Sequence, residues 1–162
     1  MTDQPRDAIQ GDVTDDAFLG GAVMVLQPRA GYRAGLDAVL LAASVPAPAA
    51  GVTLSVADAG AGVGVVGLCL AARLTTATVT LIEREPVLAQ IAEANVARNG
   101  LQARVSVRTG DVLARGQTAD PRDPVFDVVL ANPPFYDSAR SRPPRDPLRA
   151  AAHTMDETLD GW

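Results

Sequence analysis

The sequence predicts an α/β protein built around one mostly parallel β-sheet. Short apolar segments typical of buried strands recur along the chain, at residues 54–58, 78–82, 105–109 and 125–131. Amphipathic helical patterns follow the first two of these segments, and glycines mark the turn from the first strand into its helix. Because parallel strands need a crossover between them, this alternation indicates βαβ units.

Before these units, residues 22–27 predict an N-terminal strand and residues 36–45 predict a helix. We therefore divide the chain into an N-terminal strand-and-helix segment, 1–46, and a ligand-binding domain, 47–162. At 162 residues and 48% hydrophobic composition, the chain is long enough for one core, made largely of valine, leucine and alanine.

The sequence predicts neither a membrane span nor a secretion signal. Residues 38–57 carry no charge, but Pro46, Pro48 and Gly51 interrupt them, so they predict helix, loop and strand. The first twelve residues are polar and acidic and lack a signal-peptide pattern. We expect a cytoplasmic protein.

Three glycines, Gly60, Gly62 and Gly64, separate the strand at 54–58 from the helix at 65–74. Glycines at this point let the backbone approach a ligand closely, and the start of the helix offers unpaired N–H groups. The loop therefore indicates a pocket for a nucleotide-like ligand.

Acidic residues follow successive strands and define what this pocket binds. Residues 62–67 match the glycine pattern of dinucleotide sites, and Glu83 closes the next strand at the distance expected for a ribose-binding carboxylate. However, Asp58 before the first glycine would repel a pyrophosphate and attract an ammonium group. An adenosyl ligand with an amino-acid tail therefore fits better than NAD, and Asp111 ends a further strand where it can accept from an adenine amine.

The motif Asn132-Pro133-Pro134-Phe135 directly follows the apolar strand at 125–131. The prolines fix φ and lack an N–H, so the carbonyls before them can face a ligand. The Asn132 amide oxygen and the Pro133 carbonyl can accept both hydrogens of an exocyclic amine while Phe135 stacks on its ring. Taken alone, the motif is more typical of a turn that closes a strand.

In this order and spacing, the motifs resemble the class I S-adenosylmethionine-dependent methyltransferases that carry an Asn-Pro-Pro-aromatic motif. Residues 31–42, Gly-Tyr-Arg-Ala-Gly-Leu-Asp-Ala-Val-Leu-Leu-Ala, are most similar to the bacterial tRNA (adenine-N6)-methyltransferase family. The resemblance runs from about residue 26 to the end of the chain. It implies a Rossmann-like sheet and methyl transfer to a planar exocyclic amine, with adenine N6 in tRNA as the expected target.

The resemblance also implies roles for individual residues. Asp58, Gly60, Gly62 and Gly64 would line the methionine side of the S-adenosyl-L-methionine cofactor. Glu83 would bind the ribose, and Asp111 and Val112 the adenine. Asp37 would meet the amino-acid end of the cofactor, although a helix aspartate that faces water explains it equally well. The four residues of the motif would be the catalytic residues and would hold the target amine: Asn132, Pro133, Pro134 and Phe135.

The chain departs from this family in its length. A class I sheet continues beyond the fourth core strand, whereas this sequence ends at Trp162, so we expect an incomplete sheet whose strand at 125–131 becomes an edge. Three alternatives stay open: a protein glutamine methyltransferase, a guanine N2 methyltransferase, and a non-catalytic fragment that binds S-adenosylmethionine.

Charge and composition limit the remaining chemistry. The net charge of −5 opposes broad binding to nucleic acid, yet four arginines fall within ten residues just after the motif. These arginines are Arg140, Arg142, Arg145 and Arg149. They indicate either a loop that contacts tRNA or a solvated loop. With His153 as its single histidine, the sequence predicts neither a metal cluster nor a Ser/His/Asp triad, and Cys69 is expected in the core.

Overall fold

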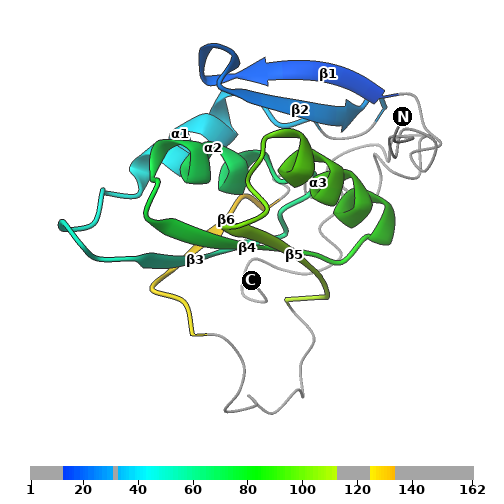
Figure 1. The fold of residues 1–162 in the computed structure, drawn as a ribbon. Coiled ribbons are helices and arrows are strands. Elements are labelled where there is room, and N and C mark those ends of the chain that lie inside the picture. The colour runs from blue at the N-terminus through cyan, green and yellow to red at the C-terminus, as the bar shows by residue number, and fades with distance from the viewer. Residues whose placement is uncertain (1–12, 31–32, 113–124, 134–162) are drawn as a thin grey trace, which may run out of the picture.

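The computed structural model describes residues 13–30, 33–112 and 125–133 (Figure 1). The elements follow in the order β1 (Val13–Phe18), a short 3-10 helix η1 (Leu19–Gly21), β2 (Val23–Pro28), α1 (Leu36–Ser44), β3 (Leu54–Ala59), α2 (Val65–Arg73), β4 (Ala77–Glu83), α3 (Pro86–Arg98), β5 (Val105–Thr109) and β6 (Val128–Ala131). The predicted alternation of strands and helices from β3 to β5 is confirmed.

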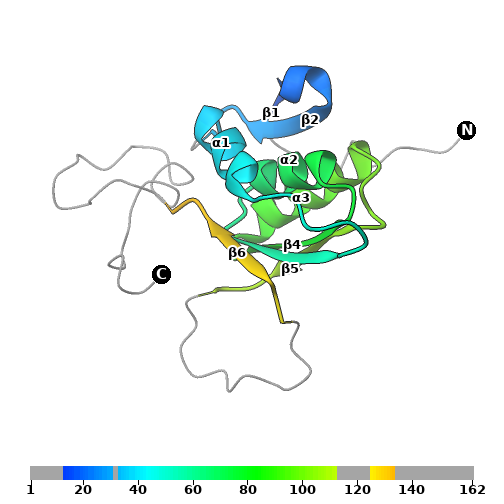
Figure 2. The same cartoon turned by 90° about the vertical axis from the view of Figure 1, so that its left-hand side faces the viewer.

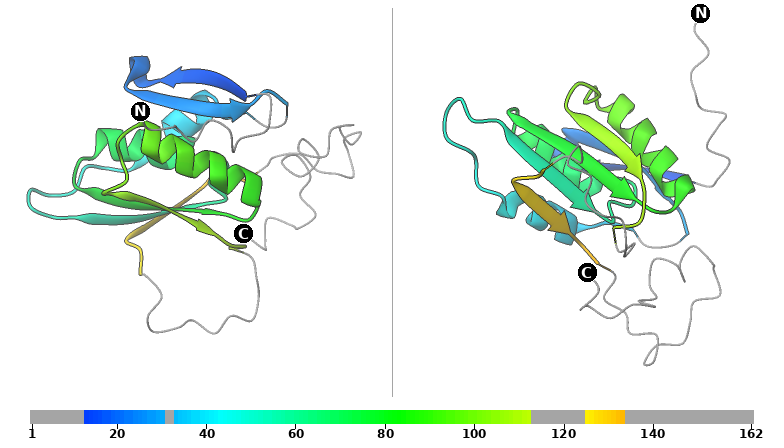
Figure 3. Two further views of the ribbon diagram at one scale, coloured as in Figure 1. Left: turned by 45° about the vertical axis from the view of Figure 1, so that its right-hand side comes forward. Right: turned by 90° about the horizontal axis from the view of Figure 1, so that it is seen from below.

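The main sheet has the strand order β5-β4-β3-β6, and all its neighbouring strands are parallel. In Figures 1 and 3 the helices lie on one face of this sheet, and the β1–β2 hairpin lies outside them as a further layer. Within the described residues β6 is at one end of the strand order. The expected incomplete sheet stays a prediction, because residues 134–162 lie outside the described residues.

Helix α2 forms the centre of the core because its residues from Val65 to Ala71 are all buried. Its Leu68 and Leu70 are fully buried, as is Leu81 of β4. Cys69 is buried too, and this burial raises the pKa of its thiol to about 11. The prediction that Cys69 is a core residue is confirmed, and such a thiol is a poor nucleophile at neutral pH.

The β1–β2 hairpin is only half predicted by the sequence. The strand at 22–27 corresponds to β2, but β1 was not predicted, because two adjacent aspartates make it a poor strand former by composition. A signal was present: Gly20 and Gly21 connect the strands with φ of +67° and +93°, conformations that glycine adopts readily.

Two asparagines of α3 bind the free edge of β2 with their side chains. Asn95 Oδ1 accepts from the Leu26 N–H at 2.8 Å, and its Nδ2 donates to the Leu26 and Val63 carbonyls at 3.0 Å. Asn99 repeats this pairing with Met24, accepting at 2.9 Å and donating at 2.8 Å. The two amides thus replace a neighbouring strand, which fixes the hairpin on α3.

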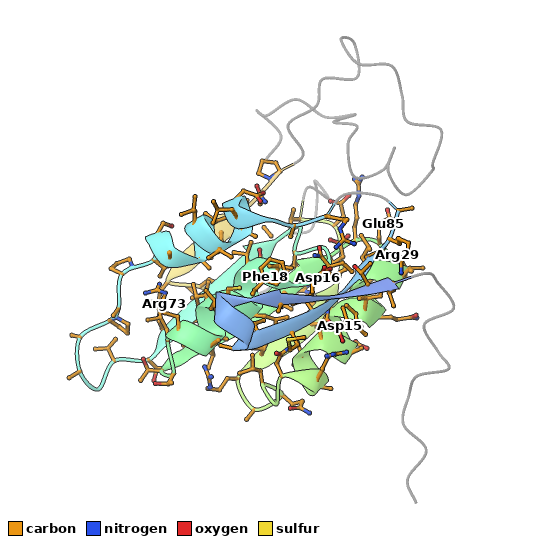
Figure 4. The ribbon with its side chains drawn as sticks, turned by 90° about the horizontal axis from the view of Figure 1, so that it is seen from above. Asp15, Asp16, Phe18, Arg29, Arg73 and Glu85 are labelled. Atoms are coloured by element: carbon orange, nitrogen blue, oxygen red, sulfur yellow. The ribbon has the colours of Figure 1, made fainter. Side chains whose placement is uncertain are left out.

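A polar network also joins the hairpin to the segment before α1. The Arg33 guanidinium donates to Asp16 at 2.6 Å, and the buried Gln27 donates to Asp16 and accepts from the Ala34 N–H. Burial opposes ionisation of Asp16, but hydrogen bonds from Thr14 and Gln27 and the charge of Arg33 outweigh it, so its pKa is lowered. Figure 4 shows Asp16 on β1, in the hairpin that lies outside the helices.

These contacts link the N-terminal elements closely to the sheet domain. The division of the chain into segments 1–46 and 47–162 stays a prediction. Among the described helices, none is both long and apolar enough to cross a membrane.

Candidate cofactor and target site

The candidate site lies at the carboxyl ends of β3, β4 and β6. The chain passes from β3 to β4 and β5 on one side, and β6 then pairs with the other side of β3. In open α/β sheets ligands bind at the carboxyl ends of the strands, beside such a reversal of strand order. The register places Ala131 next to Ala59, so the Asn132 position adjoins the glycine loop.

The glycine loop takes the left-handed backbone conformations that its sequence predicts. Gly60, Gly62 and Gly64 have φ of +68°, +56° and +91°. At Gly64 an added Cβ would lie 2.8 Å from Leu81 Cδ1, so this glycine serves packing as well as turning. At Gly62 an added Cβ would meet nothing within 4 Å, which leaves open space beside the loop.

Gly67 is a structural residue that the sequence analysis did not single out. An added Cβ there would lie 2.3 Å from Leu81 Cδ2 and 3.0 Å from Val79 Cγ1. Its role is close packing of α2 on the sheet, which is the part that the third glycine of such loops plays. The pattern at residues 62–67 contained this signal.

Glu83 holds the glycine loop to the end of β4. Its Oε2 accepts from the Gly62 N–H at 2.7 Å, and its Oε1 accepts from the Glu85 N–H at 2.8 Å. Glu83 is only 5% exposed. Each carboxylate oxygen can accept a second hydrogen bond, so this acid can also accept from a ribose hydroxyl beside Gly62.

Asp58 is a buried acid with a strongly shifted pKa. It is 1% exposed, and its Oδ2 accepts from the Gly67 N–H at 2.9 Å, so its carboxyl group faces the first turn of α2. Burial raises its pKa to about 7; the Gly67 hydrogen bond opposes this shift and the charge of Glu83 adds to it. A cationic ligand group nearby would stabilise the ionised form.

Asn132 and Asp37 meet at the end of β6, although they lie 95 positions apart in the chain. Asn132 Nδ2 donates to Asp37 Oδ2 at 2.8 Å, and Asp37 Oδ1 accepts from the Gly35 N–H at 3.1 Å. Figure 2 shows α1, which begins one residue before Asp37, beside the end of β6. The predicted role of Asp37 toward the cofactor stays a prediction, and its contact with Asn132 was not predicted.

The remaining predicted site residues divide into two groups. Asp111 and Val112 are exposed just beyond β5, where the Gly110 N–H donates to the Glu83 carbonyl at 3.0 Å. Pro133 is half-buried directly after Asn132. Pro134, Phe135, the four arginines from Arg140 to Arg149, and His153 lie outside the described residues.

Together these residues fit a nucleotide-type cofactor with an ammonium-bearing tail. The site has a left-handed glycine loop with open space beside Gly62, a carboxylate at the end of the next strand that can accept from hydroxyls, and a buried acid before the loop. This set defines an α/β protein of the nucleotide-cofactor class that has an amide at the neighbouring strand end.

Comparison with known proteins identifies the family. Residues 33–152 match the family model described as "Methyltransferase small domain", and the chain belongs to this family. It is 35% identical over 128 residues to a tRNA1(Val) (adenine(37)-N6)-methyltransferase of Porphyromonas gingivalis, an alignment that covers 78% of this chain and 49% of the relative. The chain thus spans about half the length of the curated relatives it matches.

Solved structures of methyltransferases share this fold. An S-adenosylmethionine-dependent methyltransferase from Agrobacterium tumefaciens superposes with a TM-score of 0.59 at 22% identity, covering 82% of this chain and 43% of its own. A predicted O-methyltransferase from the same organism gives 0.51 at 36% identity, covering 60% and 49%. The Rossmann-like fold, the methyltransferase family and S-adenosylmethionine as the family's cofactor, all predicted from the sequence, are confirmed.

Proposed function

We propose that the protein transfers a methyl group from S-adenosylmethionine to adenine N6 in a tRNA. The observation that carries this proposal is the adjacency of Asn132 to the glycine loop, which brings the candidate amine-binding residue next to the candidate cofactor pocket. The curated relatives, of which this chain covers 49% of the length, have this activity in their names. With tRNA as the proposed substrate, we also propose a cytoplasmic location.

The residues of this chain would bind and orient the reactants rather than exchange protons, and the proton that the methylated amine then releases would pass to water. S-adenosylmethionine, when bound, supplies a methyl group on a positively charged sulfur. Glu83 and the loop at Gly62 would hold the adenosine part, and Asp58 would face the cationic tail. Asn132 Oδ1 and the Pro133 carbonyl would accept the two amine hydrogens, which localises the nitrogen lone pair toward the methyl group. Phe135 would stack on the base.

The test is a methyl-transfer assay with radiolabelled S-adenosylmethionine and three acceptors: total tRNA, the same tRNA after nuclease digestion, and a release-factor-like protein. We expect label in intact tRNA, recovered as N6-methyladenosine after hydrolysis. Asn132→Ala should lower the single-turnover rate about 100-fold, as loss of a preorganised polar group typically does, while cofactor affinity falls only modestly. Label in the protein acceptor alone, or in guanosine, would replace the adenine proposal with one of its alternatives.

We further propose that the arginines at 140, 142, 145 and 149 contact tRNA phosphates, since a chain of net charge −5 needs a local cationic surface for this substrate. Replacing all four with serine should weaken tRNA binding and reduce the slope of log affinity against log salt by up to about one unit per arginine. Filter binding between low and moderate salt measures this slope. An unchanged slope would assign these arginines to a solvated loop.

A further inference from the structure

We infer that Asp37 is a positioning residue for the methyl-transfer site: its carboxylate fixes which way the amide of Asn132 faces. This inference rests on the proposed function, because it concerns how Asn132 meets the target amine. It adds a role for Asp37 toward the amine-binding amide, distinct from contact with the cofactor.

The first step of the argument is the hydrogen-bonding capacity of the two groups. An ionised carboxylate only accepts hydrogen bonds, and an amide has one accepting and one donating branch. The 2.8 Å contact with Asp37 Oδ2 therefore selects Nδ2 as the branch of Asn132 that faces Asp37. The oxygen, Oδ1, is then the branch turned away from Asp37, as an acceptor for an amine must be.

The second step is that Asp37 is itself held in place. Its other oxygen accepts from the Gly35 N–H at 3.1 Å, at the start of α1. The preceding residues are fixed to the hairpin, because Gln27 accepts from the Ala34 N–H and Arg33 pairs with Asp16. The N-terminal hairpin thus supports the residue that orients Asn132, which gives these elements a part in the site.

The third step is electrostatic. A charged acceptor on Nδ2 polarises the amide and makes Oδ1 a stronger acceptor, since hydrogen bonds in a chain reinforce one another. As the target nitrogen bonds to the incoming methyl carbon and the carbon–sulfur bond breaks, positive charge moves from sulfur to that nitrogen. A carboxylate hydrogen-bonded to the amide that accepts from this nitrogen stabilises the positive charge that develops there.

The decisive variant is Asp37→Asn. The new side chain is uncharged and has one accepting oxygen for two donors, the Gly35 N–H and the Asn132 NH2 group. If it accepts from Gly35, its own NH2 group faces Asn132 and reverses that amide; if it accepts from Asn132, it loses both the Gly35 contact and the charge that polarises the amide. We expect the single-turnover rate to fall by at least about 10-fold at saturating cofactor and tRNA, with cofactor affinity changed less than about 3-fold, since removal of one preorganised group typically costs this much or more.

Two further variants make the test specific. Asp127→Asn is the matched control, because Asp127 accepts from the Ser55 N–H at 2.8 Å just before β6, at the opposite end of that strand, and is exposed like Asp37. It should leave the rate unchanged. The exchange of both residues, Asp37→Asn with Asn132→Asp, restores a donor facing an acceptor and should recover part of the rate lost in Asp37→Asn.

A direct measurement needs no activity. The chain has three asparagines, so nitrogen-15 asparagine labelling gives three side-chain NH2 signals by NMR. In Asp37→Ala the Asn132 signal should shift and its protons should exchange faster with solvent, while the buried Asn95 and the hairpin-bound Asn99 stay unchanged and report an intact fold.

The outcomes separate the two proposals. An unaltered Asn132 signal in Asp37→Ala overturns the positioning role whatever the activity, and so does a loss of cofactor affinity as large as the loss of rate. A shifted signal in a protein that methylates none of the acceptors supports the positioning role and removes the proposed reaction.

Discussion

The buried acids of the site each hold the backbone around the pocket. Asp58 accepts from Gly67 in α2, and Glu83 ties Gly62 of the glycine loop to the turn after β4. The same two carboxylates are the candidates for binding a cofactor. Each of them would therefore hydrogen-bond to the backbone of the site and contact the ligand at the same time. Substitutions at these positions therefore act on stability as well as on binding.

The pKa of Asp58 predicts a pH-dependent stability. Its folded pKa, about 7, lies above the ordinary value of 3.8, so between these values the folded state binds more protons than the unfolded state. The free energy of unfolding should therefore fall as pH rises from about 4 to about 7. An order-of-magnitude slope is roughly 1.4 kcal/mol for each pH unit over which only the folded state holds the proton.

Urea unfolding of the parent and of Asp58→Asn measures this effect, because the variant cannot ionise at position 58 yet keeps an acceptor for the Gly67 N–H. The variant should gain stability relative to the parent as pH rises through this window, and the difference should level off above about pH 8, where Asp58 is ionised in both states. A constant difference across the window would show that Asp58 is ionised in the folded protein at every pH tested.

The packing of Gly67 gives a second prediction at this scale. Gly67→Ala should destabilise the fold more than Gly62→Ala, by about 3 kcal/mol through overpacking, since its Cβ would overlap Leu81. Gly62→Ala is the matched control, with open space around the Cβ but a φ of +56°, and should cost about 1–2 kcal/mol from backbone strain alone. Chemical denaturation of both variants checks the order. Equal or reversed losses would show that α2 shifts to accommodate the methyl group.

At the scale of elements, the hairpin depends on two side-chain amides. Asn95 satisfies three backbone groups and is fully buried, whereas Asn99 serves Met24 and the Asn95 carbonyl. The edge of β2 that faces α3 thus obtains hydrogen bonds that a third strand would otherwise provide. Buried groups left without such partners are costly.

We predict that Asn95→Ala destabilises the protein by roughly 2–5 kcal/mol, since it leaves the Leu26 N–H and two carbonyls without this partner. Asn99→Ala should cost less, because Asn99 is less buried. Native-state hydrogen exchange should show faster exchange at the Leu26 amide in Asn95→Ala and at the Met24 amide in Asn99→Ala. Protection that is unaltered at both amides would mean that β1 alone holds β2.

The elements from β3 to β5 were predictable because local patterns define them: apolar runs, glycines at a strand end, and Pro86 at the start of α3. The contact between Asp37 and Asn132 was not predictable, because it depends on how α1 lies against β6 and joins residues far apart in the chain. The roles of Asn95 and Asn99 were hidden for the same reason, since a helix pattern does not show which strand it contacts.

At the scale of the molecule, the site joins an edge strand to the centre of the sheet. β6 pairs with β3 over four residues and is an edge in the described part of the chain, with Val129 63% exposed. A ligand at the carboxyl ends of β3, β4 and β6 would bridge this edge strand to its neighbours. Cofactor binding should therefore stabilise the whole domain.

We predict that at pH 8, where Asp58 is ionised, S-adenosylmethionine and its demethylated product S-adenosylhomocysteine raise the melting temperature, whereas NAD does not, because the charges of Asp58 and Glu83 disfavour a pyrophosphate. At about 100 times Kd the ligand should add about 2.7 kcal/mol to the free energy of unfolding. Glu83→Gln should weaken binding by about 1–3 kcal/mol, because an amide has one accepting oxygen for the Gly62 N–H, the Glu85 N–H and the ribose hydroxyls. Glu93→Gln, at an exposed position on α3, should leave the affinity unchanged. Calorimetric titration and thermal unfolding measure both effects. Tighter binding of NAD than of S-adenosylmethionine would contradict the assignment of the pocket, and an unaltered affinity in Glu83→Gln would restrict Glu83 to holding the glycine loop.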